Sequence, residues 1–151
     1  MPTKRLRVLR ILVMVLLFLI AVQFELGMAV NIANPPTISP IGFTLNGVTQ
    51  GVGDALNTAG GAAPFHAGLG SLLVFFSVVT LVLSLRSGLR SVQIFGSLAF
   101  VATCLAATTG VLFVMSGFKN DGFSHGMATN FLLSYTFYFL TLYFLKPAPK
   151  T

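Results

Sequence analysis

The chain has 151 residues, of which 55% are apolar and 8% are charged. Soluble domains carry about 25% charged residues, so this composition and the mean hydropathy of +0.90 exclude an ordinary soluble domain. The net charge of +6 would suggest nucleic acid in a soluble chain, but in a membrane chain it reports orientation, and no nucleic-acid partner is expected. The single cysteine, Cys104, excludes an internal disulfide.

The sequence predicts an all-α fold: one integral membrane domain that forms a four-helix antiparallel bundle. A membrane span needs ~20 mostly apolar residues, and the chain has room for about four. Apolar stretches of this kind cover residues 8–30, 66–85, 91–115 and 125–145. Short connections join the second to the third and the third to the fourth, as in antiparallel helical hairpins.

The first span begins with basic residues and an apolar core from Ile11 to Val22, a pattern shared with cleaved signal peptides. No small-x-small cleavage site directly follows the core. We therefore expect a membrane anchor that remains in place.

A long outer loop over residues 31–65 is predicted between the first two helices. Pro35, Pro36 and Pro40 oppose helix at its start. A short interfacial helix near residues 49–58 is an alternative that its glycines weaken.

The basic residues predict the orientation. By the positive-inside rule, both termini of this multi-pass cell-membrane protein are cytoplasmic, and the long loop and the Lys119 loop face outward. The eight basic residues on the cytoplasmic side are Lys4, Arg5, Arg7, Arg10, Arg86, Arg90, Lys146 and Lys150.

The two histidines are predicted to lie at equal depth. His66 precedes Arg86 by 20 residues and His125 precedes Lys146 by 21, so both lie about 30 Å from the cytoplasmic boundary. Histidines at the outer ends of alternate helices are placed to face one another, and imidazoles in that arrangement suit the two axial positions of a haem iron. We therefore expect haem, either haem b or haem O/A, bound by His66 and His125.

Two other interpretations of the histidines remain. In the first, each is an ordinary polar residue at the membrane boundary. A non-haem metal would need three or four ligands, and Asp121, one turn before His125, is the only obvious carboxylate partner.

Glu25 is the only acidic residue inside an apolar segment, and an intramembrane carboxylate is costly enough to suggest a function. It lies about 22 Å along the helix from Arg10, which is in the outer half of the membrane and closer to the cytoplasmic side than the histidines. It could relay a proton, pair with a cation or bind through its protonated form. Alternatively, it points outward or bonds to Gln93, Thr108 or Thr109.

This arrangement resembles haem A synthase, a membrane enzyme that oxidises a methyl group of haem O to a formyl group during cytochrome oxidase biogenesis. The resemblance is to its compact, four-span form, and it covers nearly the whole topology with short motifs. The matching runs, in order, are Gln23 to Val30, His66 to Gly68, Thr108 to Val111, and His125 to Ala128.

The chain departs from that family in three respects. The family carries a glutamate, implicated in catalysis, about one turn before its first histidine. In this chain Ala62 and Ala63 occupy that region. The outer-loop cysteine pair of some members is missing, and one histidine pair cannot hold both a substrate haem and a cofactor haem unless two chains associate. Candidate replacements for the catalytic acid are Glu25, Asp54 and Asp121.

Three functions therefore stay open. The first is an oxidoreductase that resembles haem A synthase, which implies haem O synthase, a terminal oxidase or another membrane subunit as partners, or a homo-oligomer. The second is a b-type haem electron-transfer subunit with two histidine ligands. The third is a structural subunit without a cofactor. Under the first, His66→Ala or His125→Ala is expected to abolish haem binding.

Overall fold

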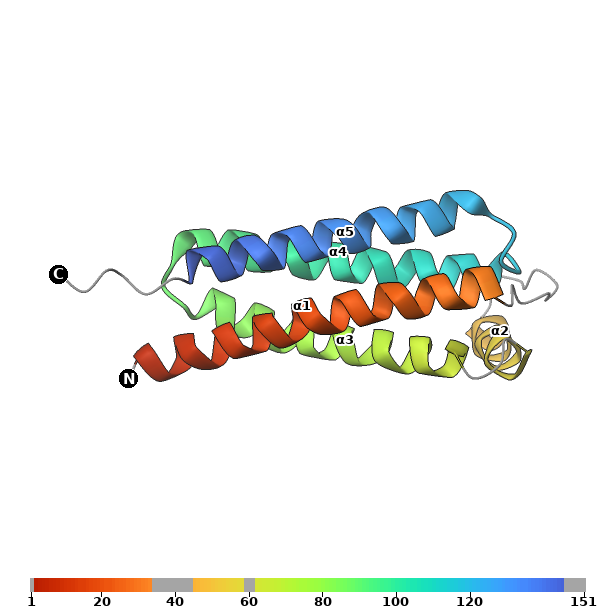
Figure 1. The fold of residues 1–151 in the computed structure, drawn as a ribbon, viewed down its shortest axis with the longest axis horizontal. Helices are drawn as coiled ribbons and strands as arrows, with labels where there is room; N and C mark the ends of the chain where they lie inside the picture. The colour runs from red at the N-terminus through yellow and green to blue at the C-terminus, as the bar shows by residue number, and fades with distance from the viewer. Residues whose placement is uncertain (1, 34–44, 59–61, 146–151) are drawn as a thin grey trace.

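Four long helices lie side by side in the computed structural model, and a fifth helix crosses one end of them (Figure 1). The structure describes residues 2–33, 45–58 and 62–145. The long helices are α1 (Pro2–Ala33), α3 (Ala62–Leu85), α4 (Arg90–Met115) and α5 (Asp121–Phe144), and the crossing helix is α2 (Leu45–Thr58). The described residues contain no strand, so the prediction of an all-helical fold is confirmed.

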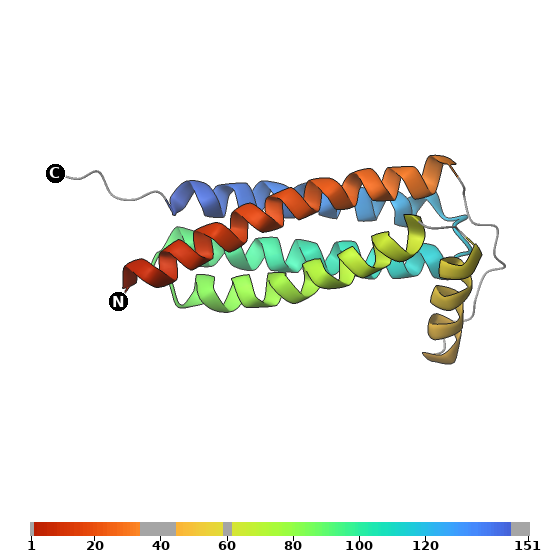
Figure 2. The same ribbon diagram turned by 60° about the horizontal axis from the view of Figure 1, so that its bottom comes forward.

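The four long helices form a ring in which neighbours pack along their length. α1 packs on α3 and α5, and α4 packs on the same two helices. α1 therefore lies diagonally opposite α4, and α3 lies diagonally opposite α5. Figure 2 shows α2 lying across one end of this bundle, where it contacts α3 and α4. We call this end the α2 end.

Part of the predicted outer loop is therefore helical. α1 continues to Ala33, α2 occupies residues 45–58, and α3 begins at Ala62, four residues before the predicted span. The three prolines that argued against helix lie outside the described residues, as do Lys146 and Lys150.

Three helical segments are long and apolar enough to cross a membrane: Lys4–Val30, Ala62–Leu85 and Arg90–Met115. The fourth predicted span corresponds to α5, which is not among them. α5 has a similar length but a more polar sequence, with Asp121, Ser124, His125 and Asn130 in its first half.

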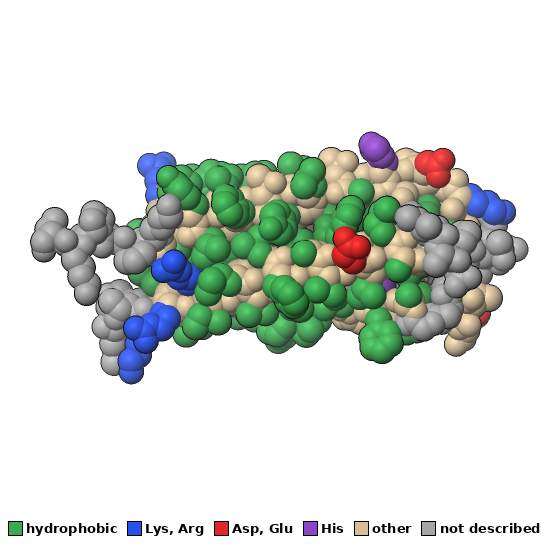
Figure 3. Space-filling view, in the orientation of Figure 1, with side chains coloured by type: hydrophobic (Ala, Val, Ile, Leu, Met, Phe, Trp, Pro, Cys, Tyr) green, Lys and Arg blue, Asp and Glu red, His purple; other side chains and the backbone are tan. Residues whose placement is uncertain are grey.

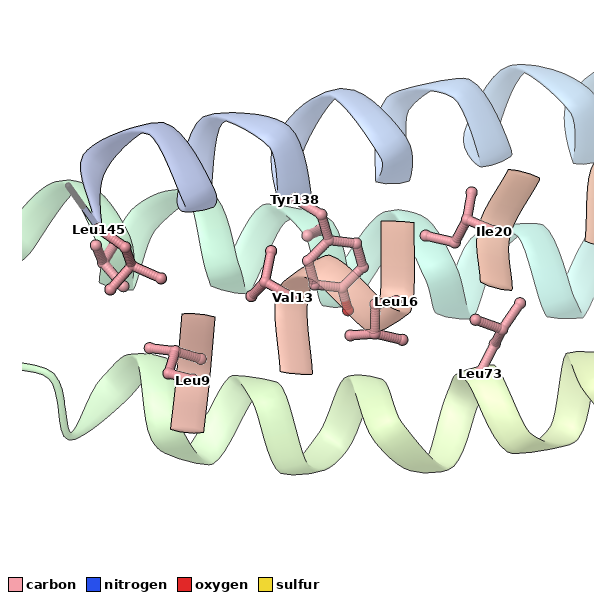
Figure 4. Close-up of a cluster of buried hydrophobic side chains, with 9 residues drawn as sticks. Leu9, Val13, Leu16, Ile20, Leu73, Tyr138 and Leu145 are labelled. Atoms are coloured by element: carbon pink, nitrogen blue, oxygen red, sulfur yellow. The ribbon is translucent and has the colours of Figure 1, made fainter. Parts of the chain in front are cut away.

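The helices meet along seams that repeat every three and four residues. On α1 the buried residues are Leu9, Val13, Leu16, Ile20 and Gln23. Their spacing alternates between four and three residues, which is the 3.5-residue period of left-handed helix packing. Figure 4 shows Tyr138 of α5 inserted between Val13 and Leu16, with its hydroxyl directed toward α3.

The bundle interior is mainly apolar but contains several buried hydroxyl groups, and much of the outside is apolar as well. The seams of α3 and α5 contain buried hydroxyl side chains, whereas large apolar side chains such as Phe18, Phe65 and Leu132 are exposed. Small and hydroxylated residues allow close helix contact where lipid surrounds the protein. The buried hydroxyl residues are Ser77, Thr80, Ser84, Ser134 and Thr141.

The charged residues leave most of the bundle surface apolar. Most of the Lys and Arg side chains visible in Figure 3 lie at the end opposite α2, a smaller basic group lies at the α2 end, and apolar side chains cover the middle. Together with the three apolar helices, this surface supports a multi-pass protein in contact with lipid.

Candidate functional site

His66 lies in the second turn of α3, at the α2 end of the bundle, with its side chain partly buried against α1. The ring fits there because residue 27 of α1 is glycine. A Cβ atom on Gly27 would lie 3.0 Å from His66 Cε1, tighter than nine in ten real Cβ contacts. Gly27 therefore forms a cradle for the imidazole.

Gln23 binds His66 through two contacts. Its amide Nε2 donates to the His66 carbonyl oxygen at 3.0 Å and lies 3.3 Å from His66 Nε2. Gln23 is only 6% exposed, because it continues the buried seam of α1. A second glycine accommodates the amide: a Cβ atom on Gly70 would lie 3.1 Å from Gln23 Nε2. We call Gln23, Gly27, His66 and Gly70 the Gln23–His66 cluster.

Two polar atoms of this cluster are buried without a hydrogen-bond partner among the described residues. They are His66 Nδ1 and Gln23 Oε1. A buried, unpaired polar atom costs about 1–3 kcal/mol, so such atoms are rare and often mark functional positions. The cluster therefore places two unpaired polar atoms side by side in the helix interface at the α2 end.

His125 has the opposite environment. It lies in the second turn of α5, its side chain is exposed, and Ser134 on the buried seam follows it by nine residues. Nine residues correspond to two and a half helical turns, so His125 lies on the face of α5 opposite that seam.

Its neighbours face the bundle instead. A Cβ atom on Gly126 would lie 3.5 Å from Thr109 Cγ2, and Met127 Sδ would lie 3.2 Å from a Cβ atom on Gly110.

The expectation that the two histidines face one another therefore fails in this structure. They do lie on diagonal helices near the same end, but His66 packs against α1 whereas His125 points away from the bundle. The difference arises from rotation of each helix about its own axis, which the depth argument leaves undetermined.

Glu25 lies at the level of His66, not below it. Gln23 and Gly27, which flank Glu25 on α1, both contact His66. The depth estimate was wrong because it was measured from Arg10, whereas α1 and its basic residues begin two turns earlier. The Glu25 side chain is exposed.

Gln93, Thr108 and Thr109, the candidate partners of Glu25, instead donate to backbone carbonyl groups of Leu85, Cys104 and Leu105.

The other two candidate acids are also exposed. Asp54 lies on α2 and Asp121 in the first turn of α5, where a carboxylate favours the helix N-terminus. Within residues 2–33, 45–58 and 62–145, no three His, Cys, Asp or Glu side chains form a group that could hold a metal ion. The structure thus brings none of the three acids into a ligand group with either histidine.

The two histidines differ in how well their positions suit an axial ligand of haem iron. His66 offers an imidazole in a glycine cradle between apolar helices, which suits one axial ligand of a haem iron. His125 cannot supply the second ligand inside the same bundle, because it lies on the outward face of α5. A pair of axial histidines from one chain does not fit this arrangement.

Gln23 is the residue whose importance the sequence concealed. In the sequence it is only the first residue of the Gln23 to Val30 run, yet in the structure it is the direct partner of His66. Its separation from the start of the basic segment was the available signal, since Gln23 follows Lys4 by 19 residues and His66 precedes Arg86 by 20.

Comparison with known proteins gives no relative: the chain matches no family model, no curated protein and no solved structure.

Proposed function

We propose that this chain is a haem-binding membrane protein that holds haem through His66 at the α2 end of the bundle. The observation that carries the proposal is the Gln23–His66 cluster, where a partly buried imidazole rests against Gly27 in the interface between α1 and α3. Imidazole nitrogen is a common ligand of haem iron. When bound, haem supplies an iron centre for redox chemistry.

In the bilayer, we propose that α5 is a fourth span beside the three apolar helices. Its large apolar side chains, including Leu132 and Phe139, are exposed as those of a lipid-facing helix would be. The positive-inside rule then places the Lys4 and Arg86 end on the cytoplasmic side of the cell membrane, and the α2 end outside.

The activity we propose resembles that of haem A synthase, in which haem O is oxidised. What supports it is the order of the short motifs along the chain, two of which meet in the Gln23–His66 cluster. The protein groups that act are His66, which binds, Gly27, which makes room for the ring, and Gln23, which orients it.

One observation favours a second candidate, a b-type haem subunit for electron transfer. Glu25, Asp54 and Asp121 all have exposed side chains, so the acids proposed for catalysis are directed away from the bundle interior. A permanent haem carrier needs an axial ligand but no catalytic acid.

The experiment is to express the protein with haem supplied, purify it, record the Soret band and identify the extracted porphyrin by mass. The proposal predicts a Soret band, and conversion of added haem O separates the enzyme from the b-type subunit. A purified, folded protein with no Soret band would contradict haem binding and favour a structural subunit.

A further inference from the structure

Gln23 holds its amide in one orientation. Its Nε2 lies 3.0 Å from the His66 carbonyl oxygen, which can only accept a hydrogen bond. The atom at this position must therefore be the amide nitrogen, since the amide oxygen would repel the carbonyl there.

The orientation of the amide decides the protonation of the neutral imidazole. The same Gln23 Nε2 lies 3.3 Å from His66 Nε2, and an amide NH₂ group can donate but not accept. His66 Nε2 must therefore present its lone pair. In a neutral imidazole, the proton then resides on Nδ1, which is the buried atom without a partner.

The packing around the pair makes this arrangement specific. The Gly27 cradle limits rotation of the ring, and Gly70 leaves space for the amide and little more. Gln23 directs both of its amide hydrogens toward His66, whereas its Oε1 has no hydrogen-bond partner among the described residues. An amide that served only to fill the helix interface would not need this geometry.

We infer that Gln23 is a positioning residue that fixes His66 in the Nδ1–H tautomer and occupies the Nε2 lone pair. An iron that binds His66 through Nε2 must then displace the Gln23 amide, so Gln23 competes with haem and weakens its binding. The competition rests on the proposed function, but the assignment of the tautomer does not.

The test is ¹⁵N NMR of the haem-free protein labelled at histidine. His66 is expected to show a protonated Nδ1 and an unprotonated Nε2. Gln23→Leu should remove this bias and leave His125, an internal control in the same spectrum, unchanged. Gln93→Leu is the matched control, because Gln93 donates to Leu85 at the other end of the bundle. A protonated Nε2 in the wild-type protein, or a Gln23→Leu spectrum like the wild type, overturns the inference.

Haem titration supplies the second measurement. Loss of one ordinary hydrogen bond predicts about two- to tenfold tighter haem binding by Gln23→Leu, whereas a purely structural role predicts weaker binding. Equal or weaker binding overturns the competition. If no variant binds haem, the proposed function fails while the NMR spectrum still decides the role of Gln23.

If Gln23→Leu does not fold, Gly70→Ala provides the same test. Its Cβ would lie 3.1 Å from Gln23 Nε2 and push the amide away without removing it. The expected changes in the His66 spectrum and in haem affinity have the same direction, and an unchanged spectrum overturns the inference.

Discussion

His66 and His125 lie near the same end of one bundle, on diagonal helices, yet their surroundings share almost nothing. The ring of His66 rests on Gly27 and contacts Gln23, whereas His125 is exposed beside a glycine that faces α4. The lesson is that equal depth in a membrane does not make two residues partners. The rotation of each helix about its own axis decides what a side chain can reach.

The outward direction of His125 depends on the rotation of α5 about its own axis. Disulfide trapping between α4 and α5 tests this rotation and should give the largest effect. In a Cys104→Ser background, the pair Thr109→Cys and Gly126→Cys should form a disulfide readily. A Cβ atom at residue 126 would lie 4.0 Å from Thr109 Cβ, within the range of natural disulfides. The measurement is the fraction of oxidised protein, read by mass after alkylation.

The control pair is Thr109→Cys with His125→Cys, which should stay reduced because residue 125 points away from the bundle. If the control pair crosslinks instead, α5 is rotated and the histidines can face one another.

A matched pair of glycine substitutions tests the cradle. Gly27→Ala should lower the free energy of unfolding by about 1–3 kcal/mol, because the added methyl group presses on the His66 ring. Gly126→Ala, next to His125, meets only an ordinary contact with Thr109 and should stabilise α5 by about 0.5–1 kcal/mol. Unfolding of both variants in the same detergent gives the two values, and equal effects would argue against a tight site at His66 alone.

The smallest expected effect concerns the hydrogen bond that fixes α5 on α4. Ser134 Oγ lies 2.7 Å from Thr103 Oγ1 in the buried seam. A double-mutant cycle with Thr103→Val and Ser134→Ala should give a coupling of about 0.6 kcal/mol, the usual value between membrane helices. The ¹⁵N spectrum of His66 should not change in these variants, because His66 is held by α1. A change there would mean that the two histidine environments are linked.

Much of the fold was predictable because apolar stretches of span length are a strong signal. The predicted span 91–115 differs from α4 by one residue at its start, and α3 ends at the predicted residue 85. Helix α2 was harder to predict, because Gly47, Gly51 and Gly53 lower the helix propensity of its sequence. Packing of α2 on α3 and α4 stabilises the helix despite this low propensity.

The site was less predictable, for a physical reason. Residues 11–22 are all apolar, so no periodicity shows which face of α1 turns inward. On α5 the usual rule is reversed, since Ser134 and Thr141 are buried while Leu132 is exposed. Without the rotation of these helices, neither the contact of Gln23 with His66 nor the outward direction of His125 follows from the sequence.

The most direct test of the account compares the haem content of His66→Ala and His125→Ala with that of the wild-type protein, all purified after expression with haem supplied. Because His66 alone is held inside the bundle, His66→Ala should lose the Soret band and His125→Ala should retain about wild-type haem. Loss of haem in both variants would restore the histidine pair predicted from the sequence, and loss in His125→Ala alone would contradict the site at His66.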